Sequence, residues 1–346
     1  MRRYAILADG NFDYVTSKTG NAILRYRPEE AVCVIDSYTA GMTAREVLGW
    51  GSDAPIVPDI REALAYSPNT LLIGIAPPGG ELPAAWRGWI TFAIKSNLDI
   101  ISGLHRYLSD DPEFSSLASR HGVTIVDLRR PPDILPFLEG SWQNREKPVL
   151  MTVGTDCNTG KMTTAWEIKE LLEKRGKRVG FVGTGQTGLL LGGYGVAVDA
   201  VKGDFISGVV EAEIDKAVKE NDFAIVEGQG SLTHQAYSGV TLGLLHGTMP
   251  DLMVLCHEPG RVTDSFGHPM FPAGEIMDLY LKLTMPFKPS RFVGVSLITQ
   301  NMTETLAMET VKTYARDYGI PAADFFRFGG ETVAAKILEF SEDLPA

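Results

Sequence analysis

A glycine-rich segment between residues 154 and 161 has the residue types and spacing of a phosphate-binding loop. An apolar run, Val149–Val153, precedes it and a helix-patterned segment follows, which is the strand–loop–helix context that a P-loop requires. Gly154 and Gly160 let the backbone turn so that its N–H groups face one anion, and Lys161 supplies a positive charge for the outer phosphates. The sequence therefore predicts a site for a phosphorylated ligand.

This loop departs from the usual pattern in two ways. Five residues separate Gly154 from Gly160 where the common pattern has four, and Met162 stands where a magnesium-binding serine or threonine is expected. Thr163 replaces that hydroxyl only if the start of the helix rotates by one residue. The loop residues expected to contact the phosphorylated ligand are Gly154, Thr155, Asp156, Cys157, Asn158, Thr159, Gly160, Lys161, Met162 and Thr163.

A carboxylate follows a second apolar strand. Phe223–Val226 is patterned as a buried strand, and Glu227 and the turn Gly228–Ser231 come directly after it. In P-loop enzymes an acid at the end of a neighbouring strand meets the metal or its bound water. Ligand sites of parallel sheets gather at the carboxyl ends of the strands, so we expect Glu227 to lie beside the phosphate loop.

Composition limits the classes of function. The chain has 346 residues, 44% hydrophobic and 22% charged, which suits about two globular domains. Its formal net charge is -11 and its sequence pI is near 5.1, with no basic patch that would track a nucleic-acid backbone. We therefore expect no nucleic-acid partner.

The cysteines and the apolar runs indicate the compartment. Cys33, Cys157 and Cys256 lie far apart without paired spacing, so neither a disulfide framework nor a zinc cluster is expected. The apolar run after Met1 is too short for a signal peptide, and no run reaches the roughly 18 residues that a membrane span needs. The expectation is a cytoplasmic protein with no membrane partner.

The first third of the chain alternates short apolar strands with helix-patterned segments, which is typical of a parallel sheet covered by helices on both faces. The expected strands are Tyr4–Ala8, Ala31–Ile35, Thr70–Ile75, Leu98–Ile101 and Val123–Leu128, and the expected helices include Thr43–Leu48, Ile60–Tyr66 and Trp86–Ser96. Polar or glycine-rich groups are expected at strand ends in Ser17–Gly20, Asp36–Ser37, Gly74–Gly80 and Gly103–His105. No Gly-x-Gly-x-x-Gly follows the first strand, so the pattern does not favour a dinucleotide site.

Paired prolines after Arg129 end this unit, because they continue neither a strand nor a helix. A short helical piece, Ile134–Leu138, and a polar run lead to the P-loop strand. The prediction is a Rossmann-like domain over residues 1–132, a linker over 133–147 and a P-loop NTPase-like domain over 148–346. The second domain should contain helices Lys161–Lys174 and Phe205–Glu220 and strands Arg178–Val182, Phe223–Val226, Leu252–His257 and Phe292–Ile298.

Two motifs resemble an ATP-dependent ligase. The segment from Gly154 to Lys161 is similar to the phosphate loop of dethiobiotin synthetase, which has the same interval between glycines. The turn Val226–Ser231 resembles the metal-carboxylate turn of that enzyme and of cobyric-acid-type amidotransferases. Met162 departs from this resemblance, because dethiobiotin synthetase has a metal-binding threonine there. Asn301 resembles the position that reads adenine in that enzyme, and adenine occurs in both ATP and CoA.

A further resemblance covers nearly the whole chain. It rests on Gly74–Gly80, Ser102–His105, Glu227–Leu232, Tyr237–Gly239, Gly243–Gly247 and Leu255–Arg261. These strings resemble a two-domain family, formerly of unknown function, that includes D-glutamate N-acetyltransferases using acetyl-CoA. The resemblance implies an N-terminal Rossmann-like domain, a C-terminal P-loop domain and acetyl-CoA as co-substrate.

The first functional hypothesis is acyl transfer. A P-loop can hold the phosphates of acetyl-CoA without cleaving them, so the missing hydroxyl at Met162 matters little. Amine attack on a thioester needs a base and oxyanion donors. His257 and His234 are the preferred bases, with His246 a third candidate, although each imidazole can instead be structural. Glu227 is a further candidate catalytic residue, and Gly228–Ser231 can offer backbone donors.

The alternative hypotheses keep ATP as the ligand. A ligase requires magnesium with oxygen ligands, which Glu227 with Asp199 or Asp204 would supply, and Thr163 would be a third. Asp204 can instead be only an N-cap for the helix that follows. A nucleotide-binding regulator that dimerises on ATP is the third hypothesis.

We also expect a small carboxylate or amino-acid substrate and a homo-oligomer. Arg261 and Lys18 are candidate partners for a carboxylate or a phosphate.

Overall fold

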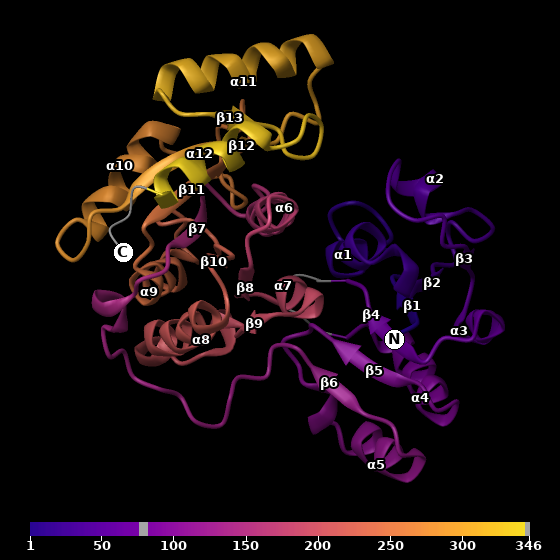
Figure 1. The fold of residues 1–346 in the computed structure, drawn as a ribbon. Helices are drawn as coiled ribbons and strands as arrows, with labels where there is room; N and C mark the ends of the chain where they lie inside the picture. The colour runs from indigo at the N-terminus through magenta and orange to yellow at the C-terminus, as the bar shows by residue number, and fades with distance from the viewer. Residues whose placement is uncertain (76–81, 343–346) are drawn as a thin grey trace. The chain divides into compact units, whose positions relative to one another are not determined.

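The computed structural model describes residues 1–75 and 82–342. The chain forms two compact units, Met1–Arg130 and Pro131–Ala346. Each unit is built on one sheet, and all the described strand pairs in both sheets are parallel (Figure 1). This confirms the predicted α/β class, with a Rossmann-like sheet followed by a P-loop type of sheet.

The first unit contains a six-stranded sheet in the order β3-β2-β1-β4-β5-β6, the order of the doubly wound dinucleotide-binding fold. Its strands are β1 Tyr4–Leu7, β2 Ala31–Ile35, β3 Ile56–Val57, β4 Thr70–Ile73, β5 Asp99–Ser102 and β6 Ile125–Asp127. Its α-helices are α1 Lys18–Tyr26, α2 Ala44–Leu48, α3 Ile60–Ala63, α4 Arg87–Lys95 and α5 Pro112–His121.

The polar segments predicted at strand ends of this unit have different placements. Ser17–Gly20 is not a strand end but the start of α1, because the chain turns through residues 8–16 before the helix begins. Asp36 directly follows β2, and its carboxylate accepts hydrogen bonds from the backbone of Gly10 (2.7 Å) and Thr39 (3.0 Å). Residues 76–80 of the predicted segment Gly74–Gly80 lie outside the described residues.

The second unit contains a seven-stranded sheet in the order β13-β12-β11-β7-β10-β8-β9. Its strands are β7 Val149–Gly154, β8 Val179–Gly183, β9 Tyr194–Gly195, β10 Phe223–Val226, β11 Leu252–His257, β12 Arg291–Leu297 and β13 Ala322–Ala323. Its α-helices are α6 Lys161–Lys174, α7 Gln186–Leu191, α8 Ile206–Glu220, α9 Ser238–Thr248, α10 Ala273–Thr284, α11 Glu304–Tyr318 and α12 Glu331–Glu342.

The helices of this unit cover both faces of the sheet. The connection from β7 through α6 to β8 runs in one direction across the sheet, and the connection from β8 through α8 to β10 runs back. Parallel crossovers are right-handed, so connections in opposite directions lie on opposite faces. Helix α12 packs against α6, and helix α9 packs against α8.

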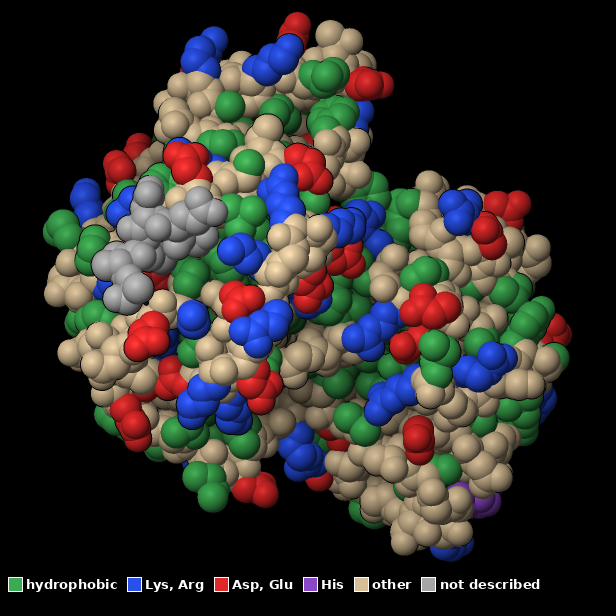
Figure 2. Space-filling model, viewed as in Figure 1, with side chains coloured by type: hydrophobic (Ala, Val, Ile, Leu, Met, Phe, Trp, Pro, Cys, Tyr) green, Lys and Arg blue, Asp and Glu red, His purple; other side chains and the backbone are tan. Residues whose placement is uncertain are grey.

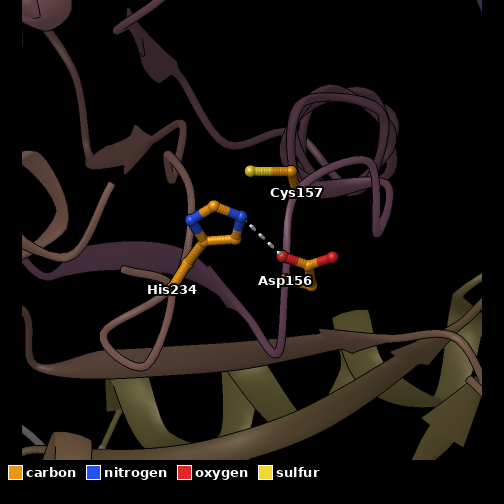
Figure 3. A group of neighbouring side chains, drawn as sticks. All are labelled: Asp156, Cys157 and His234. Carbon is orange, nitrogen blue, oxygen red and sulfur yellow. Dashed lines mark ion pairs between the residues drawn. The ribbon is translucent and has the colours of Figure 1, made fainter. Parts of the chain in front are cut away.

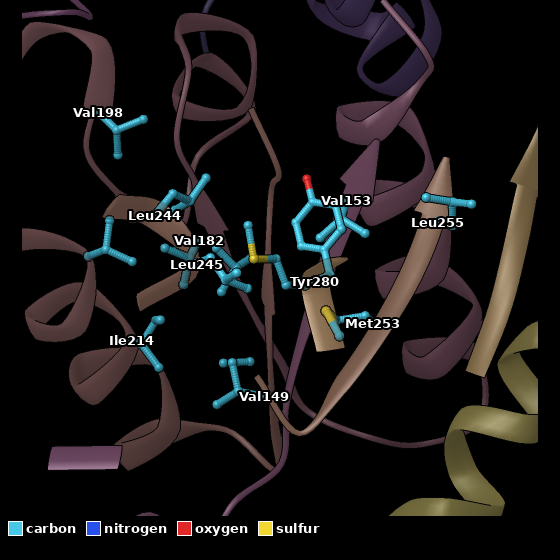
Figure 4. Close-up of a cluster of buried hydrophobic side chains, with 14 of the residues drawn as sticks. Val149, Val153, Val182, Val198, Ile214, Leu244, Leu245, Met253, Leu255 and Tyr280 are labelled. Carbon is cyan, nitrogen blue, oxygen red and sulfur yellow. The ribbon is translucent and has the colours of Figure 1, made fainter. Parts of the chain in front are cut away.

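Apolar strands make up the core between these layers (Figure 4). Every residue of β7 and of β11 is buried, as expected for central strands covered on both faces. Side chains from α8, α9 and α10 pack on the same cluster, including Ile214, Leu244 and Tyr280. On the outside, Figure 2 shows Lys and Arg side chains interspersed with Asp and Glu over the visible face.

The segment that joins the two units corrects one prediction. Ile134–Leu138 is not helical, because Pro136 lacks the N–H that a helix interior needs and disfavours the helical conformation before it. The segment is instead held on α8 by the buried Glu211, whose carboxylate accepts hydrogen bonds from the backbone of Glu139 and Ser141, both at 2.7 Å. This places the segment in the second unit.

Candidate functional site

The predicted phosphate loop joins β7 to α6, and its backbone has the conformation that its glycines allow. Gly160 is the N-cap of α6 and has φ +84°, in the left-handed region that favours glycine. Asn158 also has a positive φ, +56°. The loop therefore turns twice before the helix, and the N-terminus of α6 faces the carboxyl edge of the sheet.

Lys161 is enclosed by this loop, and only 6% of it is exposed. Its Nζ donates hydrogen bonds to the carbonyl oxygen of Asp156 (2.6 Å) and to the hydroxyl of Thr159 (3.3 Å), which are both neutral acceptors. Burial lowers the pKa of Lys161, and the nearby acidic groups, Asp156 and Glu227 among them, oppose that shift. A bound anion would stabilise the ammonium further, which is the task of a P-loop lysine.

The hydroxyl groups after the lysine do not reproduce a magnesium-binding position. Met162 occupies the usual place, and α6 begins at Lys161 as the ordinary pattern requires. Thr164, one turn into the helix, is buried and shares a hydrogen bond of 2.7 Å with Ser296 of β12. Thr163 is half-buried, and its role as a metal ligand stays a prediction.

Glu227 lies directly after β10, next to the phosphate loop. Only 4% of it is exposed, and its Oε2 accepts hydrogen bonds from the backbone of Thr184 (3.0 Å) and Gly185 (3.3 Å). Oε1 accepts a hydrogen bond from Gln229 (3.3 Å). Its neighbour Gly228 must be glycine, because a Cβ there would lie 1.8 Å from the carbonyl oxygen of Thr152. Glu227 is thus held by three donors at the edge of the loop.

His257 is the last residue of β11, and it contacts the first turn of the phosphate loop. Its Nδ1 lies 2.9 Å from the hydroxyl of Thr155, and its ring centroid lies 5.5 Å from that of Tyr314. Only 7% of the residue is exposed. Burial, helped by the positive charge of Arg261, lowers the pKa of His257 to about 4, so the ring is neutral at physiological pH.

His234 lies in the loop after β10 and packs against the same phosphate loop. The backbone N–H of Ala236 donates to its Nδ1 (3.2 Å), so Nε2 carries the proton. Nε2 lies 2.9 Å from the hydroxyl of Ser265 and 3.7 Å from Oδ1 of Asp156. This arrangement makes His234 a hydrogen-bond donor toward Ser265.

Asp156 is fully buried at the centre of this cluster. Its Oδ2 accepts a hydrogen bond from the backbone of Ser265 (2.9 Å) and pairs with Arg261 (3.0 Å), whereas its Oδ1 has no hydrogen-bond partner. Side-chain donor atoms of Asp156, Cys157 and His234 all lie within 4.8 Å of one another (Figure 3). Among the described residues this is the group that has the spacing to hold a metal ion.

Several other predicted residues lie elsewhere in the second unit. Asp199 and Asp204 are exposed residues of two short turns, Val198–Ala200 and Gly203–Phe205, and they do not group with Glu227 among the described residues. Asp204 is not an N-cap, because α8 begins at Ile206 with Phe205 as its N-cap and no side-chain cap.

The remaining candidates also differ in their surroundings. Asn301 is exposed in the turn after β12. His246 packs against Phe287, with ring centroids 5.5 Å apart, and burial lowers its pKa. Arg261 pairs with Asp156 and also lies 3.5 Å from Glu258. Lys18 belongs to the first turn of α1 in the other unit.

Sequence reasoning found Arg261 but missed two other residues of the segment that follows β11, Asp264 and Ser265. Ser265 and Asp264 both approach His234, the latter at 4.0 Å from Nε2. Nothing in their local pattern marks these two residues. Their position in the chain was the available signal. They follow β11, which ends in His257, and the carboxyl ends of parallel strands lie at the same edge of a sheet, so the segment after β11 starts at the edge where the phosphate loop lies.

The comparisons with known proteins agree with this architecture. Residues 136–334 match the model described as the P-loop domain of a domain of unknown function, DUF1611. The chain belongs to the DUF1611 family. Residues 37–131 match the Rossmann-like N-terminal domain of the same family. This confirms the two-domain family that the sequence motifs indicated.

Relatives of this DUF1611 chain extend over nearly its whole length. A D-glutamate N-acetyltransferase from a Pseudoalteromonas species is 34% identical over 340 residues, 96% of this chain and 98% of the relative. A protein of the same name from Tritonibacter scottomollicae is 35% identical over 322 residues, 92% of each chain. The crystal structure of a DUF1611 protein from Anabaena variabilis has a TM-score of 0.93 at 35% identity, covering 98% of this chain and 100% of that one.

The helices in the described part of the chain are all too short or too polar to cross a membrane.

Proposed function

We propose that this chain is an N-acetyltransferase that uses acetyl-CoA to acetylate the amino group of a small amino acid such as D-glutamate. The observation that supports this is its similarity to two D-glutamate N-acetyltransferases over at least 92% of its length. Because the match covers both units, it includes the Rossmann-like unit as well as the P-loop that many unrelated enzymes share.

The phosphate loop suits a ligand whose phosphates are bound but not transferred. CoA carries a diphosphate and a ribose phosphate, and a P-loop binds such groups through backbone N–H groups and its lysine. Phosphoryl transfer would also need magnesium held by a hydroxyl and a carboxylate. Here Met162 replaces the hydroxyl, and both oxygens of Glu227 already accept hydrogen bonds.

The transfer step assigns different roles to the two histidines. The amine nitrogen bonds to the thioester carbonyl carbon, the carbon–sulfur bond breaks, and CoA leaves as a thiolate that takes up a proton. The amine must lose a proton to a base, and His257 suits this role because its ring is neutral. His234 suits the role of oxyanion donor as long as no metal ion occupies its Nε2, because this atom then carries a proton.

Glu227 acts in this proposal by positioning the turn that follows it. Its hydrogen bonds to the backbone of Thr184 and Gly185 hold Gly228 against β7, and Gly228 donates a hydrogen bond to the hydroxyl of Thr152 (3.1 Å).

An anionic ligand on the loop would raise the pKa of His257 toward the operating pH, where a general base is most effective.

Calorimetry of acetyl-CoA and of Mg-ATP on the same preparation tests the proposal. We expect acetyl-CoA to bind, and D-glutamate to trigger the release of free CoA thiol in a colorimetric assay, with L-glutamate as the stereochemical comparison. Binding of Mg-ATP with no affinity for acetyl-CoA would overturn the proposal and favour a ligase of the dethiobiotin synthetase type.

A further inference from the structure

We propose that Asp156, Cys157 and His234 bind a divalent cation of the zinc type beside the phosphate loop. This site is separate from the magnesium site considered above, which would use Thr163, Glu227 and an exposed aspartate. It also goes beyond the proposed acetyl transfer, and its test does not depend on that activity.

The donor set points to this class of ion. A thiol, an imidazole and a carboxylate offer their donor atoms within 4.8 Å of one another. Zn²⁺ prefers such sulfur, nitrogen and oxygen donors in a tetrahedral arrangement, whereas Mg²⁺ prefers oxygen donors in an octahedron. Figure 3 shows Asp156 and Cys157 on adjacent positions of the loop, with the His234 ring facing the carboxylate. Three protein ligands leave a fourth position open.

The unpartnered oxygen of Asp156 is an independent indication of a ligand. The carboxylate is fully buried, and Oδ1 has no hydrogen-bond partner, although it faces Nε2 of His234 at 3.7 Å. A buried charged oxygen left in this way is costly unless something binds it. The other oxygen, Oδ2, is held by Arg261 and by the backbone of Ser265, which orients the carboxylate as outer-shell partners do at metal sites.

The charges around the site leave room for a cation. Asp156 and Asp264 both approach His234, and Arg261 is the cation paired with Asp156. A dication bound by the Cys157 thiolate would add positive charge beside the two carboxylates.

Binding requires one local rearrangement. Nε2 carries a proton and lies 2.9 Å from Ser265, so the metal must displace that contact and move the proton to Nδ1, which breaks the bond from Ala236. Losing these two hydrogen bonds together lowers affinity by roughly a hundredfold. Structural zinc sites with four protein ligands bind at about nanomolar concentrations or tighter, and a site with three protein ligands and this loss should bind more weakly, which the titration measures.

Metal titration of the full chain tests the proposal. After dialysis against a chelator, we expect one equivalent of Zn²⁺ to bind in competition with a colorimetric zinc indicator. Co²⁺ should give a thiolate-to-metal charge-transfer band that disappears in Cys157→Ala. Zinc affinity should fall at least about tenfold in Cys157→Ala and in His234→Gln, because even outer-shell changes cost that much.

Two variants serve as matched controls. Cys33→Ala removes a core thiol from the other unit, and His268→Gln removes an exposed histidine from the segment that carries Ser265. Both should bind zinc as the unchanged protein does. Zinc should also raise the melting temperature of the unchanged protein and not that of Cys157→Ala. This measurement tests the metal site even if His234→Gln does not fold.

Three results would overturn the proposal: no stoichiometric zinc, equal affinity in Cys157→Ala, or a cobalt spectrum that does not depend on Cys157. Acetyl transfer is measured separately on the same samples. A protein that transfers acetyl groups without binding zinc refutes the metal site alone, and a protein that binds zinc but does not use acetyl-CoA refutes the proposed function alone.

Discussion

Charged side chains are buried at both ends of the seven-stranded sheet, but they are paired differently at the two ends. At the amino ends of the strands, Arg145 is 3% exposed along its side chain and contacts Asp215 at 3.1 Å, while it also donates to the carbonyl of Thr248 (2.7 Å). Lys288 and Asp251 form a second pair at 2.5 Å. Each of these four charged side chains is matched by an opposite charge.

At the carboxyl ends the charges are only partly matched. Lys161 donates to two neutral oxygens, and Asp156 keeps one oxygen without a hydrogen bond. His257 has a strongly lowered pKa beside them. A buried charge without a partner destabilises the fold, so such charges are found where a bound ligand compensates for this loss. The comparison predicts that changes at the amino end affect folding and that changes at the carboxyl end affect binding.

The largest effect should come from the amino end. Arg145→Met removes a buried guanidinium and leaves Asp215 and the carbonyl of Thr248 without it, so the free energy of unfolding should fall by about 3 kcal/mol. Urea unfolding measures the loss. The affinity of the folded protein for acetyl-CoA should not change, and a loss of affinity without a loss of stability would contradict the comparison.

At the carboxyl end, Lys161→Ala should lower the affinity for phosphorylated ligands and leave the stability of the fold unchanged. Losing a charge-assisted hydrogen bond to phosphate costs about 1.5–3 kcal/mol, or roughly ten- to a hundredfold in affinity, while the fold stays intact. Calorimetry with acetyl-CoA and a thermal melt measure both quantities. Lys288→Ala is the matched control, since it should lower stability and leave the affinity alone. Unchanged affinity of Lys161→Ala for each phosphorylated ligand tested would disprove the P-loop assignment.

The lowered pKa of His257 makes the stability of the protein depend on pH. Its pKa is about 4 in the folded chain against about 6.5 in the unfolded chain, so the unfolded state takes up more protons as the pH falls below 6.5. Its contribution is therefore complete above pH 6.5 and is lost on acidification, by about 2 kcal/mol between pH 7 and pH 5.

His257→Asn should flatten this part of the stability profile, as measured by urea unfolding at the two pH values, and should lower turnover at pH 7. His246, whose pKa is also lowered by burial but which packs on Phe287 near Lys288, is the matched control for turnover. Equal loss of turnover in His246→Asn and His257→Asn would mean that both histidines act through the fold.

The smallest expected effect is that of magnesium. Because Met162 removes the usual hydroxyl and both oxygens of Glu227 already accept hydrogen bonds, turnover should be the same with and without added Mg²⁺. Steady-state rates in EDTA, followed by separate addition of Mg²⁺ and Zn²⁺, measure this. Activity that returns only with Mg²⁺ would favour phosphoryl transfer.

Local patterns in the sequence determined the fold class and the phosphate loop. Continuous apolar runs predicted β7 and β11 because central parallel strands are buried on both faces, and Gly154, Gly160 and Lys161 predicted the turn that follows. The pattern failed at the start of α1, where we placed Ser17–Gly20 at a strand end, and at Ile134–Leu138, where Pro136 and contacts with α8 decide the conformation.

Only the tertiary structure decided which side chains meet at the site. His234 and Ser265 are 31 residues apart, yet their side chains lie 2.9 Å apart. Asp156 and Arg261 pair at 3.0 Å because β7 and β11 are adjacent parallel strands whose carboxyl ends share one edge. Hydrogen-bond partners, burial and the resulting pKa of His257 depend on such long-range neighbours. A local pattern of residues does not contain them, because it records the order of side chains along the chain and not the distances between them.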